Sequence, residues 1–327
     1  MNIEIPYYSD STRISNSNIG WYLDKGPVYL HAMLTGKIEG ETGQQLARGT
    51  MIHEYILQPE EFQKDYVVWN KSRPSSEQRE MFCRELANSV EIEPNKAIVS
   101  AFRASYKNLP KSDDLVLSKG LKMAEEYSDY IEYLKSNDGR IMITPSSAIQ
   151  LSTIVGNINE HKLASVLVDL DKKSKEYEES HNEFHINWEY EGILCKSLID
   201  RCCFNFKKKK CMLIDLKTTV HIAKFEESMK QYDYLRQLCF YTLALKWYIK
   251  NELNDNPEEW EFEWAIVGID TTGTNEIRVF KFNKEQIYSR YNTIVEALKN
   301  ISWHQKTGKW EHTVEYYNGD GSEILNL

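Results

Sequence analysis

Residues 194–219 read LCKSLIDRCCFNFKKKKCMLIDLKTT. Two apolar runs flank four consecutive lysines, which is the pattern of two strands joined by a polar turn. The first run carries Asp200, and the second ends in Asp215, Leu216 and Lys217. Side chains two residues apart share a face of a strand, so Asp215 and Lys217 point the same way, and the hairpin can bring Asp200 beside them. The stretch therefore predicts two carboxylates and an ammonium group that converge at one end of a sheet.

The segments around this hairpin predict an α/β fold, with a mixed central sheet flanked by helices and a helical N-terminal elaboration. Apolar residues spaced by three and four before residue 140 predict mainly helices. We expect a helix-rich part over residues 1–140 and a core over 141–327, packed as one compact unit. The elements expected around the hairpin are a helix near 42–58, a strand at 183–190, strands at 193–206 and 211–218, a helix over about 223–250, strands near 260–270 and 276–282, and a helix near 284–303.

The composition is that of an ordinary globular protein, with 41% hydrophobic residues in a chain of 327. A net charge of −9 weighs against a protein that coats DNA without specificity. The sequence lacks a signal peptide and a run long enough to cross a membrane, so we expect a cytoplasmic protein that does not bind membranes. The six cysteines form no C-x-x-C pair, which favours reduced thiols over a zinc or iron–sulfur site.

The converging charges have a use in phosphodiester hydrolysis, which needs a hard cation to polarise the phosphate and to acidify a water molecule. Oxygen ligands suit Mg²⁺ or Mn²⁺. Asp200 and Asp215 can supply them, and the carbonyl of Leu216 can add a third. Lys217 can orient the water or neutralise charge on the phosphate, and beside a metal it can also serve as a base.

Simpler interpretations exist for each pattern. An acid-x-Lys triplet also occurs at Asp171, where it lies in a polar run and indicates only solvated charges. The charges of the hairpin could form a surface salt bridge, which would contribute little stability. The lysine run 207–210 is typical of a soluble hairpin tip, although it could also contact DNA phosphates without reading sequence.

Several motifs resemble, in order, those of PD-(D/E)XK nucleases, and most closely those of RecE-like phage exonucleases related to RecB and lambda exonuclease. The similarity covers most of the chain and is weakest at 75–140. Ile199 stands where the name of the superfamily implies a proline. The segments that carry the resemblance are Ile14-Ser15-Asn16-Ser17 with Gly26-Pro27, Gly49-Thr50-Met51-Ile52-His53 with Leu57-Gln58-Pro59, Gly192 to Asp200, Ile214 to Thr219, and Tyr234, Gln237 and Tyr241.

The resemblance extends the candidate site to further residues. His53 matches a histidine that helps to hold the metal, although by itself it reads as a helix residue that merely packs. Tyr234, Gln237 and Tyr241 share a helix face and resemble residues that contact DNA or order the site, although they could equally be polar edges of a core helix. Glu183, at the start of the strand before the hairpin, is a further candidate acid.

By this resemblance, the chain is expected to be a Mg²⁺- or Mn²⁺-dependent exonuclease that degrades linear duplex DNA from its ends, 5′ to 3′, in phage recombination or DNA processing. The expected partners are DNA, a single-strand annealing protein and further copies of the chain in a ring. The host cytoplasm is the expected location. The alternatives are an endonuclease or flap nuclease on the same core, a noncatalytic DNA-binding module, and a metal-dependent hydrolase of another substrate.

Overall fold

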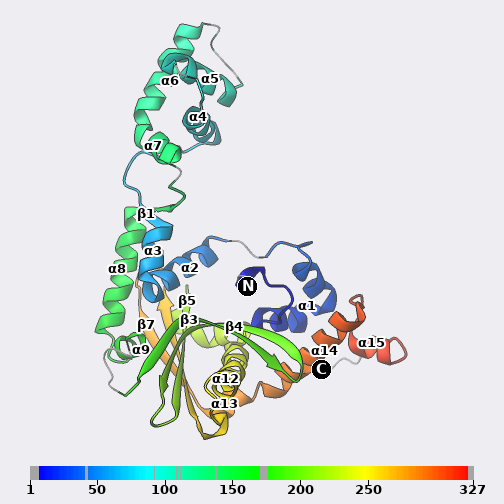
Figure 1. The fold of residues 1–327 in the computed structure, drawn as a ribbon. Coiled ribbons are helices and arrows are strands. Elements are labelled where there is room, and N and C mark those ends of the chain that lie inside the picture. The colour runs from blue at the N-terminus through cyan, green and yellow to red at the C-terminus, as the bar shows by residue number, and fades with distance from the viewer. Residues whose placement is uncertain are drawn as a thin grey trace. The chain divides into compact units, whose positions relative to one another are not determined.

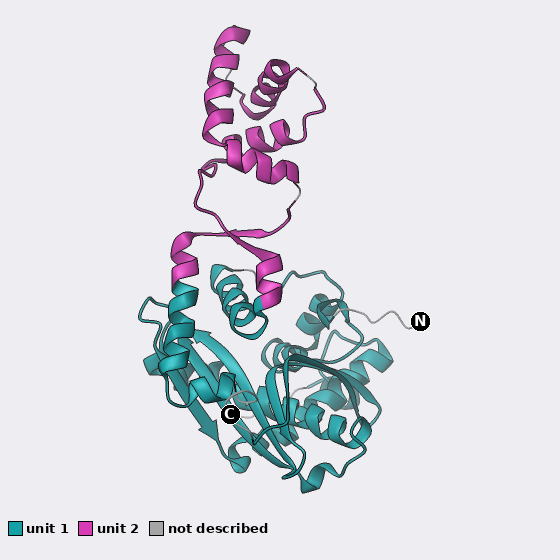
Figure 2. Ribbon diagram, turned by 60° about the vertical axis from the view of Figure 1, so that its left-hand side comes forward, with its two compact units in different colours: residues 1–59, 150–327 teal, residues 60–149 magenta. Residues whose placement is uncertain are grey.

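In the computed structural model, the described residues are 7–40, 43–91, 93–107, 110, 112–136, 138–169 and 176–322. The chain divides into two compact units, and Figure 2 colours each of them. Unit 1 combines residues 1–59 with residues 150–327, and unit 2 comprises residues 60–149. These units do not follow the expected division near residue 140, because the first 59 residues belong with the sheet.

Unit 1 contains the expected mixed sheet, with the strand order β3-β4-β5-β6-β7. The three strands around the lysine turn form an antiparallel meander, β5 and β6 run parallel, and β6 and β7 are antiparallel (Figure 1). The strands are β3 (Glu179–Tyr190), β4 (Ile193–Asn205), β5 (Lys210–Thr219), β6 (Glu261–Asp270) and β7 (Ile277–Phe282). The expected α/β class is therefore present.

The β4 and β5 strands pair along only part of their length. Their ladder runs from Asn205 opposite Lys210 to Arg201 opposite Ile214, and no pair is formed beyond it in the described residues. Beside the other half of β4, the N-terminal chain takes the free edge: the Ile14 amide donates to the Leu194 carbonyl at 2.9 Å. The two strands thus diverge next to Asp200 and Asp215, the residues that follow the last pair.

The β3 strand is irregular at Glu183. This residue has φ +48°, in the left-handed region that residues other than glycine rarely adopt. It lies between the pairs Asn182–Arg201 and Phe184–Ile199, so the register places it opposite Asp200. The irregularity and the divergence of β4 from β5 therefore meet at one place in the sheet.

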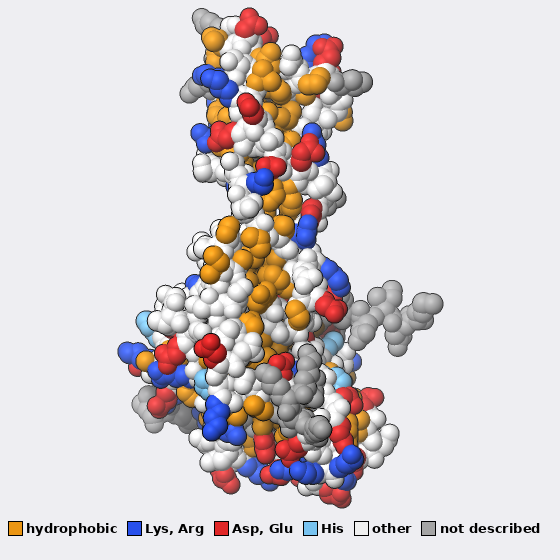
Figure 3. Space-filling view, turned by 90° about the vertical axis from the view of Figure 1, so that its left-hand side faces the viewer, with side chains coloured by type: hydrophobic (Ala, Val, Ile, Leu, Met, Phe, Trp, Pro, Cys, Tyr) orange, Lys and Arg blue, Asp and Glu red, His pale blue; other side chains and the backbone are white. Residues whose placement is uncertain are grey.

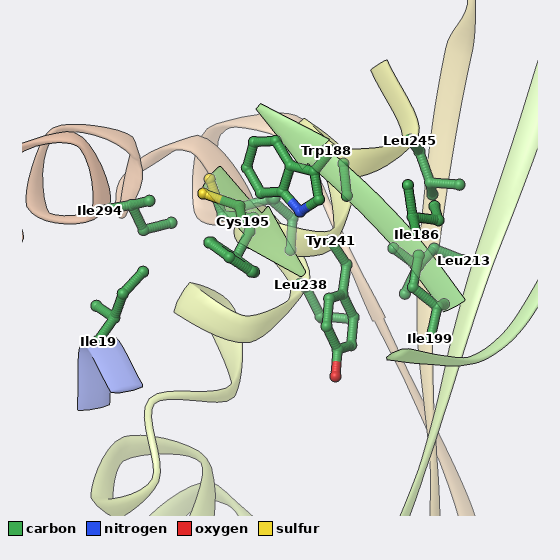
Figure 4. Close-up of a cluster of buried hydrophobic side chains, with 14 of the residues drawn as sticks. Ile19, Ile186, Trp188, Cys195, Ile199, Leu213, Leu238, Tyr241, Leu245 and Ile294 are labelled. Carbon is green, nitrogen blue, oxygen red and sulfur yellow. The ribbon is translucent and has the colours of Figure 1, made fainter. Parts of the chain in front are cut away.

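Helices of unit 1 cover the sheet and complete its core. The α12 helix packs against β3 and β4, α2 packs against β4 and β5, and α1 packs against α14 (Figure 1). Figure 4 shows part of the core, in which Trp188 of β3 and Leu238 of α12 lie among buried apolar side chains. The helices of this unit are α1 (Asn16–Leu34), α2 (Gln44–Leu57), α9 (Ala164–Val168), α11 (Phe225–Gln231), α12 (Tyr234–Asn251), α13 (Lys284–Tyr288), α14 (Tyr291–Thr307) and α15 (Val314–Asn318), with 3₁₀ turns η1 (Tyr7–Ser9), η2 (Ile222–Lys224) and η3 (Pro257–Glu259). The α8 helix (Pro145–Glu160) begins in unit 2 and continues into unit 1.

Two helices that the periodicity predicts as single are each broken. The helix expected over 223–250 is divided at Asp233, which has φ +45° and whose side chain caps α12 by accepting the Arg236 amide. Asp is one of the few residues whose short polar side chain tolerates the left-handed conformation. The helix expected near 284–303 is likewise divided, after Tyr288.

Unit 2 has a core of its own, made by four helices whose buried residues include Phe82, Phe102 and Tyr130. A short parallel pair of strands joins Tyr66–Val68 to Ile141–Ile143 in the same unit. The elements are α3 (Pro59–Asp65), β1 (Tyr66–Val68), α4 (Glu77–Ala87), α5 (Pro94–Ser105), α6 (Asp113–Glu126), α7 (Ser128–Ser136) and β2 (Ile141–Ile143). In the described part of the chain, none of the helices has the length and apolar character needed to cross a bilayer.

Candidate metal centre

A histidine and two carboxylates converge where β3, β4 and α2 meet. His53, Glu183 and Asp200 each offer one ligand atom, and these atoms all lie within 4.8 Å of one another. The His53 Nδ1 atom is 3.6 Å from Asp200 Oδ2. One nitrogen and two oxygens at such spacing are within reach of a single cation.

Backbone irregularity positions the two acids. The register places Glu183 opposite Asp200, although the two residues form no ladder pair. Where the β4–β5 ladder stops, Asp200 Oδ2 accepts the Leu216 amide at 2.7 Å. A side-chain bond thus replaces the missing backbone pairing and holds the carboxylate in place.

The α2 helix brings His53 to the strands by a close approach. A Cβ atom added to Gly49 would lie 3.0 Å from Thr218 Oγ1 of β5. Glycine at this position therefore lets the helix backbone lie near the strand, one turn before His53. The His53 side chain is 22% exposed, so it borders both the protein and the solvent.

Asp215 and Lys217 form a buried ion pair beside this cluster, with Lys217 Nζ 2.6 Å from Asp215 Oδ2. The side chains are 1% exposed for Asp215 and 17% for Lys217. Asp215 Oδ1 is buried and has no hydrogen-bond partner. Because a buried carboxylate oxygen is costly to leave unsatisfied, this atom is suited to receive a ligand.

The carboxylates raise one another's affinity for protons. Burial raises the pKa of Glu183 to about 7, and the charges of Asp200 and Asp215 add to the shift. Burial also raises the pKa of Asp215 to about 6, although Lys217 opposes the change. The pKa of Asp200 is raised by burial as well. The acids thus repel each other when ionised, and a cation between them would relieve the repulsion.

His53 and Lys217 have opposite protonation tendencies. Burial and the nearby Lys217 charge lower the pKa of His53 to about 4, so the imidazole is neutral and able to bind a metal. Burial acts to lower the pKa of Lys217, but the charges of Asp215 and Asp200 outweigh it, and the pKa lies above its usual value. Lys217 is therefore an ammonium group, which favours charge neutralisation over the role of a base.

The α12 helix contributes the remaining residues that the sequence singled out. The Gln237 side-chain amide donates to the Tyr241 hydroxyl at 2.9 Å. Figure 4 shows this hydroxyl pointing away from the apolar cluster that surrounds the ring. Lys217 Nζ lies 5.2 Å from the centre of the Tyr234 ring. Tyr234 thus lies next to the charged Lys217, whereas Gln237 and Tyr241 are hydrogen-bonded to each other.

The residues present fit Mg²⁺ or Mn²⁺, because the donors are carboxylates and one neutral imidazole and no described cysteine belongs to the cluster. The grouping differs in detail from the sequence hypothesis. Glu183, the additional candidate acid, joins His53 and Asp200, whereas Asp215 is engaged by Lys217. The Leu216 carbonyl is also at the site, where it accepts a hydrogen bond from Lys217 at 3.4 Å.

The N-terminal segment, residues 7–10, packs on β4, the strand that carries Asp200, which the sequence interpretation missed. Lys196 of β4 is buried, and its ammonium donates to the Tyr7 carbonyl at 2.5 Å and to the Asp10 carbonyl. A lysine within a largely apolar strand was the signal available in the sequence, since a buried ammonium needs acceptors.

The lysine run at the tip of the β4–β5 hairpin is not a bare basic patch. Each of the four side chains contacts at least one carboxylate, at 3.1 Å or less for the nearest partner. On the face drawn in Figure 3, Lys and Arg side chains are interspersed with Asp and Glu. The triplet at Asp171 lies outside the described residues.

Comparisons with known proteins leave the family open. No family model matches the chain, and none of the curated proteins matches it. Among solved structures, the chain is similar to a crystal structure from Eubacterium rectale that is described as a candidate exonuclease. The TM-score is 0.49 at 11% sequence identity, over 100% of this chain and 96% of the other.

Proposed function

We propose that this protein is a metal-dependent deoxyribonuclease of the PD-(D/E)XK class, similar to RecE-like exonucleases, that degrades linear duplex DNA from its ends in the 5′-to-3′ direction. The observation that carries the proposal is the cluster of His53, Glu183 and Asp200, with ligand atoms within 4.8 Å of one another. The buried Asp215–Lys217 pair beside it supplies the ammonium group that phosphate chemistry requires.

Each residue has a role that follows from its surroundings. His53, Glu183 and Asp200 would hold Mg²⁺ or Mn²⁺, with the unsatisfied Asp215 Oδ1 as a further ligand. When bound, the ion polarises the phosphate and lowers the pKa of the attacking water. Lys217, fixed by Asp215, would stabilise the negative charge that develops on the phosphate oxygens.

The α12 residues would position the DNA. Gln237 and Tyr241 form a hydrogen-bonded pair whose polar ends can donate to a backbone phosphate. Tyr234 packs beside Lys217 and limits where its ammonium group can point. In the same proposal, the biological partners are linear duplex ends, a single-strand annealing protein and further copies of the chain in a ring, in the cytoplasm of a phage host.

The test is digestion of 5′- and 3′-end-labelled linear duplex DNA in Mg²⁺ or Mn²⁺, with and without EDTA. Wild type is compared with Lys217→Ala and with a control, Lys208→Ala, whose side chain pairs with Glu176 at the hairpin tip. We expect Lys217→Ala to lower kcat by about 100- to 1,000-fold, the usual loss when a transition-state donor is removed. The control should retain full activity.

The outcomes separate the alternatives. Activity retained in Lys217→Ala would reject the mechanism, and activity retained in EDTA would reject the metal. Cleavage of a covalently closed circular plasmid would indicate an endonuclease instead of an exonuclease. Binding of DNA in Mn²⁺ without cleavage would favour the noncatalytic DNA-binding module.

A further inference from the structure

Exposed aromatic side chains are rare in this protein. The chain has 8 tryptophans, 20 tyrosines and 11 phenylalanines, and all of them lie in the described residues. Only Tyr8 and Tyr232 are exposed, at 86% and 57%, whereas every other aromatic residue is buried or partly buried. Two large rings that stay in water do not contribute the stabilisation that burial gives, which is typical of residues that bind a ligand. Their neighbours indicate which ligand they could contact.

Tyr8 lies on a firmly held segment that packs against β3 and β4, the two strands that carry Glu183 and Asp200. Its ring packs edge-on against Tyr7 at 5.2 Å, and Tyr7 packs edge-on against His185 of β3 at 5.3 Å. Lys196 binds the Tyr7 carbonyl at 2.5 Å. Nearby protein atoms, together with the charges of Glu183 and Asp200, raise the pKa of Tyr8. The Tyr8 ring is therefore exposed to solvent, while the residues beneath it are packed against the sheet.

Tyr232 is connected to Lys217 through the ring of Tyr234. Its ring stacks on Tyr234 at 5.8 Å, and the Tyr234 ring lies 5.2 Å from Lys217 Nζ. The backbone next to Tyr232 is fixed at Asp233, whose carboxylate binds Arg290 at 2.8 Å and caps α12. Tyr232 therefore projects from a rigid junction between α11 and α12.

We propose that Tyr8 and Tyr232 stack on unpaired bases on either side of the scissile phosphate, so that the site receives a single strand or a frayed duplex end. This inference rests on the proposed function and deepens it, because it names the form of DNA that enters. Both rings are exposed, both stand on packed neighbours, and each borders a different charged part of the site.

Stacking suits an enzyme that must act at any sequence. Every base has an aromatic face, so stacking tolerates all four bases, whereas hydrogen bonds to base edges would select among them. Bases inside a duplex have both faces covered by neighbouring pairs, and the terminal pair leaves only its outer face open, whereas unpaired bases can leave the stack and offer their faces to both rings. The two tyrosines would therefore favour separation of the last base pairs over binding of intact duplex.

The experiment measures binding of a short oligothymidine that carries one 2-aminopurine, and of a blunt duplex, in Ca²⁺ to suppress cleavage. Fluorescence of 2-aminopurine falls when the base stacks on an aromatic ring. We compare Tyr8→Ala, Tyr232→Ala, the corresponding Phe variants, and Tyr29→Ala of α1 as a control that lies outside both clusters. Melting temperatures establish that each variant is folded, and Tyr232→Leu replaces Tyr232→Ala if the latter melts early.

We expect each Ala variant to weaken binding of oligothymidine by about 5- to 100-fold, as for the loss of one base–aromatic stack. Quenching should be lost in the Ala variants and retained in the Phe variants and the control. The rate on blunt duplex should fall more than the rate on a duplex with two unpaired terminal bases.

Two failures are distinguishable. If wild type neither binds nor cleaves DNA, the proposed function is wrong and this inference falls with it. If wild type cleaves DNA and the Ala variants bind and cleave like the control, only the stacking inference is wrong. If the Phe variants lose as much binding as the Ala variants, the hydroxyl groups and not the rings are responsible. That result would also overturn the stacking inference.

Discussion

Glu183 has a left-handed backbone in the middle of a strand, with φ +48°, and a carboxylate that faces Asp200 and Asp215. Such a conformation costs about 1–3 kcal/mol in a residue other than glycine, and crowded carboxylates cost more when ionised. Neither feature stabilises the fold. Unfavourable local geometry of this kind is typical of functional sites, where a ligand compensates for it.

Replacement of Glu183 by Gln should make the cation-free protein more stable above neutral pH. The pKa of Glu183 is raised to about 7, so the folded state holds the proton more tightly than the unfolded state, in which the pKa is ordinary. The wild type therefore loses stability as pH rises from about 4.5 to about 7, and the variant does not show this loss. We expect a difference of about 1–3 kcal/mol at pH 8 and almost none near pH 4.

The measurement is urea unfolding in EDTA at pH 4, 6 and 8. Glu189→Gln, on the same strand but exposed, serves as the control and should show no such trend. A Glu183→Gln advantage that is equal at all three pH values would contradict the assignment of the effect to ionisation.

Replacement of Asp200 by Asn should weaken Mn²⁺ binding by at least about tenfold, because one anionic ligand is lost from a small set. The side-chain oxygen of Asn can still accept a hydrogen bond from the Leu216 backbone amide, so the fold should be retained. Titration calorimetry with Mn²⁺ measures the change. Asp255→Asn is the matched control, since Asp255 pairs with Lys209 at the hairpin turn. Equal affinity in wild type and Asp200→Asn would remove Asp200 from the ligand set.

The sequence predicted the neighbours Asp200, Asp215 and Lys217 because two-residue periodicity and a hairpin are both local patterns. Glu183 stood out much less, since its place in the cluster depends on an irregular backbone and on the register of β3 against β4. His53 entered only through a family resemblance. Nothing in the local pattern of a helix says which distant strand one of its histidines will face.

At the scale of elements, the position of α2 decides whether His53 reaches the acids. Gly49→Ala adds a Cβ atom at 3.0 Å from Thr218 Oγ1, so the helix or the threonine must shift by a few tenths of an ångström. We expect the variant to bind Mn²⁺ several-fold more weakly while its stability changes little, because alanine favours helix by about 1 kcal/mol over glycine and offsets the clash.

The double variant Gly49→Ala, Thr218→Ala provides the control, because removal of the Thr218 hydroxyl takes away the contact. Calorimetry should show Mn²⁺ affinity restored to that of Thr218→Ala alone. If the affinity stays low in the double variant, the close approach of α2 to β5 is not what sets the position of His53.

Helix breaks were harder to predict than helices. The apolar spacing continues through Asp233, although the backbone of that residue has the left-handed conformation. It also continues past the end of α13 at Tyr288. The spacing of apolar residues shows which face of a helix is buried. It does not show where one helix ends and the next begins, if both bury the same face. In the function proposed above, the break at Asp233 matters because Tyr232 and Tyr234 lie on either side of it.

At the scale of the whole molecule, the sequence predicted the strands of the mixed sheet more closely than it predicted the division into units. The meander and the strands after α12 follow from alternation and turns. The helices before residue 140 look alike in sequence, yet residues 1–59 belong with the sheet, whereas residues 60–149 form a separate unit. Amphipathic spacing shows that a helix needs a partner and does not identify the partner.

The separate core of unit 2 predicts that a fragment of residues 72–140 folds alone. Its helices α4–α7 enclose Phe82, which is fully buried, together with Phe102 and Tyr130. A domain of this size is only marginally stable, so we expect a cooperative but low-temperature thermal transition by circular dichroism. Phe82→Ala should abolish that transition, because loss of a buried Phe costs about 3–5 kcal/mol, whereas Val90→Ala at a 97% exposed position should not alter it. A fragment that melts gradually, with Phe82→Ala indistinguishable from Val90→Ala, would show that unit 2 depends on the rest of the chain.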